Sequence, residues 1–225
     1  MPELSGVAVI FDLDGTLVDT AADLAAAMNH VLVENGLAPT PLDRVRHLVG
    51  HGARAMLKQG FAQAGRSPAE VELDGHVDLF LDYYMAHIAD ESRPFPGALQ
   101  AIVQLKADGA SVAICTNKRE IWARALMREL NLETEFAAIV GADTVGVAKP
   151  DAAPVLHCLA LTGAARGVFV GDSDTDIRAA AAASMPCLAA RFGYGPLTLA
   201  DQAEACFSNY AEAGPLIRQA ARKFA

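Results

Sequence analysis

Residues 11–20, with the sequence FDLDGTLVDT, decide how this chain is expected to fold. They overlap the end of the apolar run VAVIF at residues 7–11, which is continuous, as in a parallel strand that helices cover on both faces. Asp12 and Asp14 therefore follow a buried strand, and Gly15 permits a sharp turn after them. Neighbouring carboxylates repel each other, so the pair needs a cation or a shared proton. Hard oxygen ligands of this kind favour Mg²⁺, although Asp and Gly after a strand also form simple turns.

Outside residues 20–92, the chain alternates short apolar runs with helical patterns. Further strands are predicted at residues 111–115, 137–140, 168–170 and 187–190. Helices are predicted at residues 97–108, 120–130, 152–161 and 176–184. Alternation of strand and helix predicts right-handed crossovers and a parallel α/β sheet. Ligands of such sheets bind at the carboxyl ends of the strands.

The stretch 20–92 carries helical signals alone. Helix starts are indicated at Thr20, Thr40-Pro41 and Ser67-Pro68, each followed by apolar residues at helical spacing. The chain then returns through RPFPG, residues 93–97. We therefore predict a helical cap domain at 20–92, inserted into a core formed by residues 1–19 and 93–225. Both linkers would lie near the carboxyl end of the first strand.

A second acidic segment, GDSDTDIRAA at residues 171–180, follows another apolar strand. Asp172, Asp174 and Asp176 open the predicted helix there, and any one of them could be an ordinary helix cap. Three together exceed what capping requires. They predict a second wall of the same metal site.

Two further segments place polar side chains after predicted strands. CTNK, residues 115–118, offers the Thr116 hydroxyl and the Asn117 amide where a helix is expected to begin, a place that attracts anions. Lys149-Pro150 precedes another helix, although a single lysine is usually a solvated surface residue. In chain order the strand ends thus offer a carboxylate pair, a hydroxyl and amide, a lysine and an acidic cluster. This set predicts a site for Mg²⁺ and phosphate.

Composition excludes several classes of protein. The 225 residues are 52% hydrophobic, which is too apolar for a disordered chain, and no apolar run is long enough to span a membrane. The formal net charge of −9 opposes broad binding to nucleic acid or anionic lipid. The cysteines lack metal-site spacing and lie beside apolar residues, which predicts free thiols in the cytoplasm: Cys115, Cys158, Cys187 and Cys206. No signal for an oligomeric state is present.

The four segments together, D-x-D-G-T, T-N, K-P and G-D-x-x-x-D, resemble the signature of the haloacid dehalogenase superfamily. The helical insert resembles the phosphoglycolate phosphatase and beta-phosphoglucomutase branch. T-N-K, S-R-P-F-P-G and G-D-S-D-T-D are most similar to bacterial phosphoglycolate phosphatases. The resemblance implies a Rossmann-like core and a Mg²⁺-dependent phosphoric monoester hydrolase. It also implies a small phosphorylated metabolite, first of all 2-phosphoglycolate, as the partner.

The resemblance further implies catalytic roles. Asp12 would be the nucleophile that forms an aspartyl-phosphate. Asp14 would be the acid that protonates the leaving oxygen and then the base that activates water. Thr116 and Lys149 would bind the transferred phosphoryl group, with support from Asn117.

The same resemblance implies a metal site. Mg²⁺ would be held by Asp12, Asp172 and the backbone carbonyl of Asp14. Asp176 would orient Lys149 or a water on the metal, whereas Asp174 receives no definite role and could simply cap the helix.

Several functions remain open on the residues alone. A phosphomutase of the same branch would use the same site, as would a phosphatase for sugar phosphates, nucleotides or pyrophosphate. A dehalogenase is disfavoured because it needs no metal and has no evident use for Asp14. A phosphoacceptor domain of the response-regulator type is disfavoured because such domains are shorter and lack a helical insert.

The segment GHGARA, residues 50–55, matches the dinucleotide-binding pattern G-x-G-x-x-A. No buried strand precedes it, so the match carries little weight. We interpret it as a turn between two helices of the insert. If that turn faces the site, Arg54 and His51 are candidate substrate contacts, and Arg54 could bind a substrate carboxylate in a bidentate manner.

Overall fold

The computed structural model describes residues 2–223 and contains a six-stranded parallel sheet with the order β5-β4-β1-β6-β7-β8. Its strands are β1 (Val7–Phe11), β4 (Ser111–Cys115), β5 (Ala138–Val140), β6 (Arg166–Gly171), β7 (Cys187–Ala190) and β8 (Ala205–Phe207). β1 lies in the centre, paired with β4 on one side and β6 on the other. The chain builds β4 and β5 on one side of β1 before it crosses to the other side. The carboxyl end of β1 is therefore the place where such sheets bind ligands.

Helices cover both faces of the sheet. One face carries α5 (Ala98–Ala107), α6 (Glu120–Glu129) and α9 (Tyr210–Lys223), and the other carries α7 (Ala152–Thr162) and α8 (Asp174–Ala182). The residues of β1 point alternately into these two layers. This two-sided burial explains why the strand is apolar at every position.

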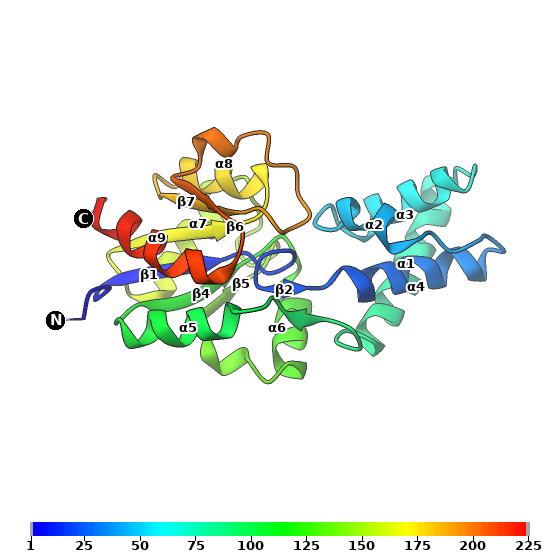
Figure 1. Ribbon diagram of the computed structural model, residues 1–225. Helices are drawn as coiled ribbons and strands as arrows, with labels where there is room; N and C mark the ends of the chain where they lie inside the picture. The colour runs from blue at the N-terminus through cyan, green and yellow to red at the C-terminus, as the bar shows by residue number, and fades with distance from the viewer. Residues whose placement is uncertain (1, 224–225) are drawn as a thin grey trace.

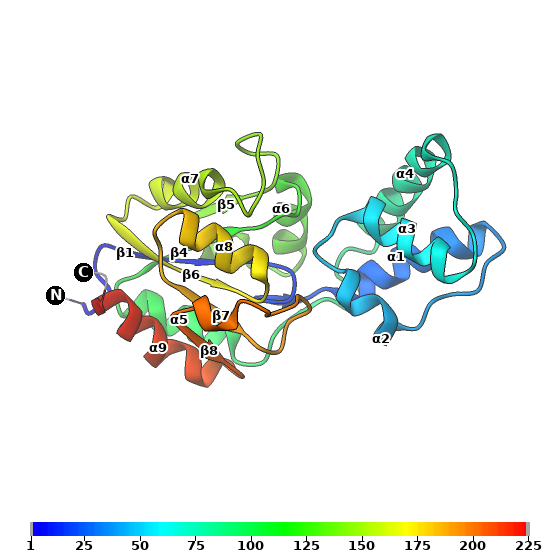
Figure 2. The ribbon, with the colours of Figure 1, turned by 90° about the horizontal axis from the view of Figure 1, so that it is seen from above.

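The segment between β1 and β4 forms a separate group of helices, which we call the cap helices. They are α1 (Ala21–Glu34), α2 (Leu42–Val45), the 3₁₀ turn η1 (Arg46–Leu48), α3 (Ala53–Gln63) and α4 (Glu70–Ala86). Figures 1 and 2 show them beside the sheet, at the end away from the carboxyl end of α9. Two short strands, β2 (Val18–Asp19) and β3 (Arg93–Pro94), pair antiparallel where the chain leaves the sheet and returns.

A buried carboxylate clamps these two linkers together. Asp23, in the first turn of α1, is 2% exposed and accepts hydrogen bonds from the backbone N–H groups of Glu91 and Ser92. The Ser92 hydroxyl also donates to it, with 2.6 Å between the oxygens. The carboxylate therefore ties the start of the cap helices to the segment that leads back to the sheet.

Replacing Asp23 with Ala is expected to lower the free energy of unfolding by about 1–3 kcal/mol. The substitution leaves the buried N–H and hydroxyl of Ser92 and the partly buried N–H of Glu91 without their acceptor, and each unsatisfied group costs free energy. Urea unfolding of both proteins measures the difference. Asp78→Asn, on α4, is a control in which a carboxylate outside this clamp is removed. Equal stability of Asp23→Ala and the wild type would contradict the clamp.

The predicted α/β fold is confirmed, and each expected core strand and helix is present with its ends shifted by at most two residues. No sequence pattern indicates β2, β3 or β8, which are two or three residues long. Two expected helix caps are wrong, because α2 begins after Pro41 and α4 begins after Ala69. The domain boundaries 1–19, 20–92 and 93–225 stay a prediction, and residues 1, 224 and 225 lie outside the described residues. Among residues 2–223, every helix is too short or too polar to cross a membrane.

Candidate active site

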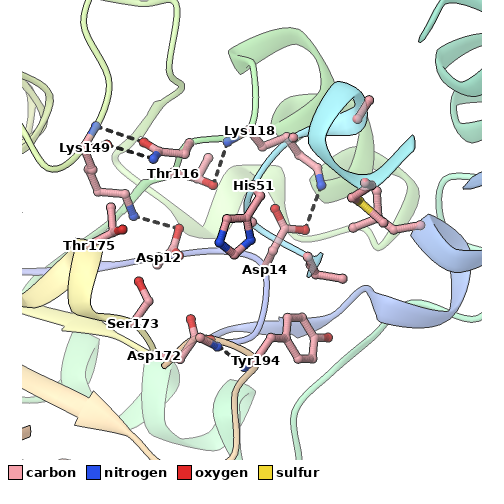
Figure 3. A pocket seen from close by; sticks show the side chains of 18 of the residues that line it. Asp12, Asp14, His51, Thr116, Lys118, Lys149, Asp172, Ser173, Thr175 and Tyr194 are labelled. Carbon is pink, nitrogen blue, oxygen red and sulfur yellow. Dashed lines mark hydrogen bonds and ion pairs between the residues drawn. The ribbon is translucent and has the colours of Figure 1, made fainter. Parts of the chain in front are cut away.

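A cavity of about 190 Å³ lies where the carboxyl ends of β1, β4 and β6 face the cap helices. Figure 3 shows the side chains that line it. Residues of the sheet and its flanking loops supply most of the polar groups of the cavity. Met56, Phe80 and Tyr84 of the cap helices form an apolar part of its wall. The predicted strand ends therefore do meet at one place.

Lys149 joins two of the predicted carboxylates. Its Nζ lies 2.9 Å from Asp12 Oδ1 and 2.7 Å from Asp176 Oδ1, and its side chain is 1% exposed. Burial by itself lowers the pKa of Lys149, but the two carboxylates outweigh burial and raise the pKa above its usual value. Lys149 is therefore a permanently charged group beside Asp12.

Asn117 holds the backbone of Lys149 in place. The Asn117 amide accepts from the Lys149 N–H and donates to the Lys149 carbonyl oxygen, with both distances 2.9 Å. The neighbouring Thr116 is 3% exposed and also lines the cavity. Its hydroxyl accepts a hydrogen bond from the backbone N–H of Lys118. Thr116 and Lys149 thus both face the space beside Asp12.

Asp172 and Asp176 follow β6, as predicted, and have different partners. Asp172 Oδ1 accepts from the Thr16 hydroxyl at 2.9 Å, and Oδ2 accepts from the Tyr194 N–H at 2.7 Å. Asp176 Oδ2 accepts from the Ser173 hydroxyl while Oδ1 binds Lys149. Asp176 is therefore occupied by neighbouring groups, which suits a supporting role.

Glycine is needed where the first turn passes Asp172. Gly15 has φ +82°, and a Cβ there would lie 2.5 Å from Asp172 Oδ2. Gly193 leaves space on the other side, where a Cβ would lie 2.2 Å from Asp172 Cβ. A side chain at either position would displace this carboxylate.

The acidic cluster fits a divalent cation. Asp12, Asp172 and Asp176 each offer a carboxylate oxygen, all within 4.8 Å of one another. Burial, together with the nearby carboxylates of Asp176 and Asp172, raises the pKa of Asp12 to about 7, although the Lys149 ammonium opposes this rise. Burial and Asp176 likewise raise the pKa of Asp172 to about 6. The clustered carboxylates thus carry more negative charge than Lys149 offsets. Oxygen ligands with excess negative charge suit Mg²⁺.

Asp14 lies beside a cation that sequence reasoning missed. Lys118 Nζ donates to Asp14 Oδ1 at 2.7 Å, and the Thr20 hydroxyl donates to the same oxygen at 2.6 Å. The Lys118 side chain is only 6% exposed. Tyr194 was also missed, although its backbone binds Asp172 and its hydroxyl accepts from the Thr20 N–H. Lys118 adjoins the T-N motif and could have been suspected, whereas nothing in the sequence marks Tyr194.

The role of Asp174 differs from the capping that was considered. Ser173 is the N-cap of α8, and its hydroxyl accepts from the Asp176 N–H. Asp174 instead accepts hydrogen bonds from the Thr198 hydroxyl and from the Leu199 N–H. It therefore fixes the loop that follows Gly195 against α8.

His51 and Arg54, the two candidate substrate contacts of residues 50–55, lie in different surroundings. His51 lines the cavity, and Figure 3 shows its ring pointing toward the space beside Asp12 and Asp14. The His51 Nδ1 lies 3.3 Å from the Leu48 carbonyl oxygen, which can only accept a hydrogen bond, so this contact favours a proton on Nδ1.

Arg54 lies in α3 outside the residues that line the cavity. Its guanidinium pairs with Glu70 and Asp74 of α4, and its side chain is 43% exposed. The arrangement keeps Arg54 away from the cavity, because two carboxylates of the neighbouring helix hold the guanidinium. Binding of a substrate carboxylate by Arg54 stays a prediction, and this placement does not favour it.

Arg54→Ala is expected to change kcat/KM for a carboxylate-bearing phosphoester by less than about twofold. The lost ion pairs are exposed and screened by solvent, and pairs of this kind contribute little. Steady-state phosphate release by both proteins measures the effect. A tenfold or larger loss confined to carboxylate-bearing substrates would show that Arg54 reaches the substrate after all.

Known proteins resemble this chain over most of its length. A model of the haloacid dehalogenase-like hydrolases matches residues 9–190. Phosphoglycolate phosphatase of Caulobacter vibrioides is 44% identical over 194 residues, 85% of this chain and 82% of the relative. Phosphoglycolate phosphatase of Rhodospirillum rubrum is 38% identical over 214 residues, 92% of this chain and 89% of the relative.

A solved structure shares the same fold. The crystal structure of a predicted phosphoglycolate phosphatase from Haemophilus somnus aligns with a TM-score of 0.84 and 27% identity, and the alignment covers 95% of this chain and 97% of that one. The family match extends over all four motifs, from Asp12 to Asp176. The resemblance seen in the sequence is therefore confirmed, and this chain belongs to the haloacid dehalogenase-like hydrolases.

Proposed function

We propose that this hydrolase is a Mg²⁺-dependent phosphatase whose substrate is 2-phosphoglycolate and which works through an aspartyl-phosphate. The observation that carries the proposal is the position of Asp12, next to the Lys149 ammonium and within an acidic cluster at the carboxyl end of β1. The names of the similar Caulobacter and Rhodospirillum proteins support 2-phosphoglycolate as the substrate.

In the first step, a carboxylate oxygen of Asp12 attacks phosphorus. The bond between phosphorus and the ester oxygen breaks, and Asp14 gives a proton to that leaving oxygen. Lys149 and the Thr116 hydroxyl bind the transferred phosphoryl group and offset its charge as the anionic nucleophile approaches. The products of this step are glycolate and the aspartyl-phosphate.

In the second step, water attacks the phosphorus of the aspartyl-phosphate. Asp14 takes a proton from that water, the acyl phosphate bond breaks, and inorganic phosphate leaves with Asp12 restored. Dividing hydrolysis into two displacements replaces one difficult step with two easier ones. Thr20 and Lys118 hold Asp14 in place for both proton transfers.

Asp12, Asp172 and the main-chain carbonyl of Asp14 would hold the Mg²⁺. When bound, the ion neutralises charge on the phosphoryl oxygens and orients them. Asp176 remains paired with Lys149, which keeps that lysine directed toward Asp12.

The cavity also limits the substrate. Its volume of about 190 Å³ is below the 300–1,000 Å³ of pockets that hold drug-sized molecules, which favours a small metabolite over a nucleotide. His51 lines the cavity from the cap side, which supports a contact between its ring and the leaving group.

Phosphate release from a panel of small phosphorylated compounds tests the proposal. The panel contains 2-phosphoglycolate, glucose 6-phosphate, AMP and pyrophosphate, each with and without Mg²⁺. We expect the largest kcat/KM for 2-phosphoglycolate with Mg²⁺. A larger kcat/KM for another compound of the panel would make that compound the proposed substrate. Conversion of a sugar phosphate to its isomer without phosphate release would show that the protein is a mutase.

A further inference from the structure

Lys118 is a buried cation that the two chemical steps do not use directly. It lies between β4 and α6, two residues after Thr116, and its side chain is 6% exposed. Burial lowers the pKa of Lys118, but Asp14 outweighs burial and raises the pKa above its ordinary value. An ammonium kept charged in a cavity next to apolar residues attracts anions strongly.

The ammonium of Lys118 has donor capacity left. One N–H donates to Asp14 Oδ1, and the ring of Tyr84 lies beside the ammonium, with 5.0 Å from Nζ to the ring centroid. An ammonium has three N–H groups, so at least one has no acceptor among the described residues.

The cavity presents its two ammonium groups at different places. Figure 3 shows Lys149 and Lys118 on opposite sides of the Asp12 and Asp14 pair. Lys149 belongs to the side of the nucleophile and the acidic cluster. Lys118 belongs to the side of Asp14, next to the Tyr84 wall contributed by α4. The part of a substrate beyond its leaving oxygen would therefore meet Lys118.

We infer that Lys118 determines specificity by binding the carboxylate of the substrate. This inference rests on the proposed function, which supplies a substrate with a phosphoryl group at one end and a carboxylate at the other. The Lys118 ammonium then shares its N–H groups between Asp14 and that carboxylate. It takes the place that sequence reasoning gave to Arg54, whose guanidinium is held by Glu70 and Asp74.

Two substrates, one with and one without a carboxylate, test the inference. In 2-hydroxyethyl phosphate, an uncharged alcohol replaces the carboxylate of 2-phosphoglycolate. The wild type should prefer 2-phosphoglycolate, and Lys118→Met should reduce the ratio of the two kcat/KM values by roughly 10- to 100-fold, the size of a lost charged hydrogen bond. Lys118→Arg, which keeps the charge, should recover part of the ratio.

The ratio of the two kcat/KM values distinguishes binding of the carboxylate by Lys118 from positioning of Asp14 by Lys118. A loss of Asp14 positioning would lower turnover of both substrates equally, and partial unfolding would do the same, so neither changes the ratio. Lys106→Met is the matched control, because Lys106 is an exposed lysine of α5 paired with Glu135. An unchanged ratio in Lys118→Met would overturn the inference.

Binding gives a readout that does not depend on turnover. Calorimetry on Asp12→Asn, with and without Lys118→Met, compares the affinities for the two phosphoesters. We expect Lys118→Met to weaken binding of 2-phosphoglycolate alone. Equal affinity for both ligands before the lysine is replaced would overturn the inference. Absence of phosphate release by the wild type, with this binding preference intact, would overturn the proposed function and leave Lys118 as the carboxylate site.

Discussion

Asp12→Asn is expected to abolish phosphate release while the protein stays folded. An amide cannot attack phosphorus as a carboxylate does, so the first displacement is lost. Several kcal/mol of barrier reduction are at stake, and turnover should fall by about a thousandfold or more. Fold should persist because the amide has nearly the same shape and Lys149 keeps its second partner, Asp176, at 2.7 Å.

The measurement is single-turnover and steady-state phosphate release, accompanied by circular dichroism and the Tm. Asp201→Asn, on the exposed turn Ala200–Gln202, makes the same chemical change away from the cavity and should keep full activity. Trapping of a phosphorylated protein by acid quench should succeed for the wild type and fail for Asp12→Asn. Turnover near the wild-type rate in Asp12→Asn would remove this residue from the mechanism.

Removal of divalent metal is expected to stop the wild-type enzyme almost completely. The cavity is lined by two lysines, Lys118 and Lys149, and by five aspartates: Asp12, Asp14, Asp172, Asp174 and Asp176. A dianionic phosphate would add to this excess of negative charge, so it should not bind productively without the cation. Chelation should lower kcat/KM by roughly a hundredfold or more, and added Mg²⁺ should restore it.

The carboxylate ligands also predict which metal ion restores activity. Carboxylate oxygens prefer Mg²⁺, whereas Zn²⁺ prefers thiolate and imidazole ligands, so Zn²⁺ should restore activity poorly. Asp172→Ala should resist rescue by Mg²⁺ even at high concentration, since it removes a ligand without touching Asp12. Full activity after exhaustive chelation would exclude the metal from the reaction.

Local patterns in the sequence were sufficient to predict five of the six strands of the sheet, all but β8, and the motif residues that follow them. A fully buried strand such as β1 must be apolar throughout, and this property is visible in five consecutive letters. The residues that follow parallel strands must meet at one sheet edge, so the order of residues along the chain is enough to group Asp12, Thr116 and Asp172. The short strands β2, β3 and β8 were not predicted, because two or three residues are too few to show a periodic pattern of apolar residues.

Contacts between distant segments were decided by the tertiary structure alone. Lys118 and Asp14 are 104 residues apart, and a single lysine looks the same in sequence whether it is solvated or buried. Arg54 was expected at the substrate, but packing of α3 on α4 placed two carboxylates within its reach. The order of residues along the chain is enough to tell which residues follow each strand, because strand and helix formation depend on neighbours along the chain. Which side chains share the cavity depended on how the cap helices pack against the sheet, and no local pattern encodes that packing.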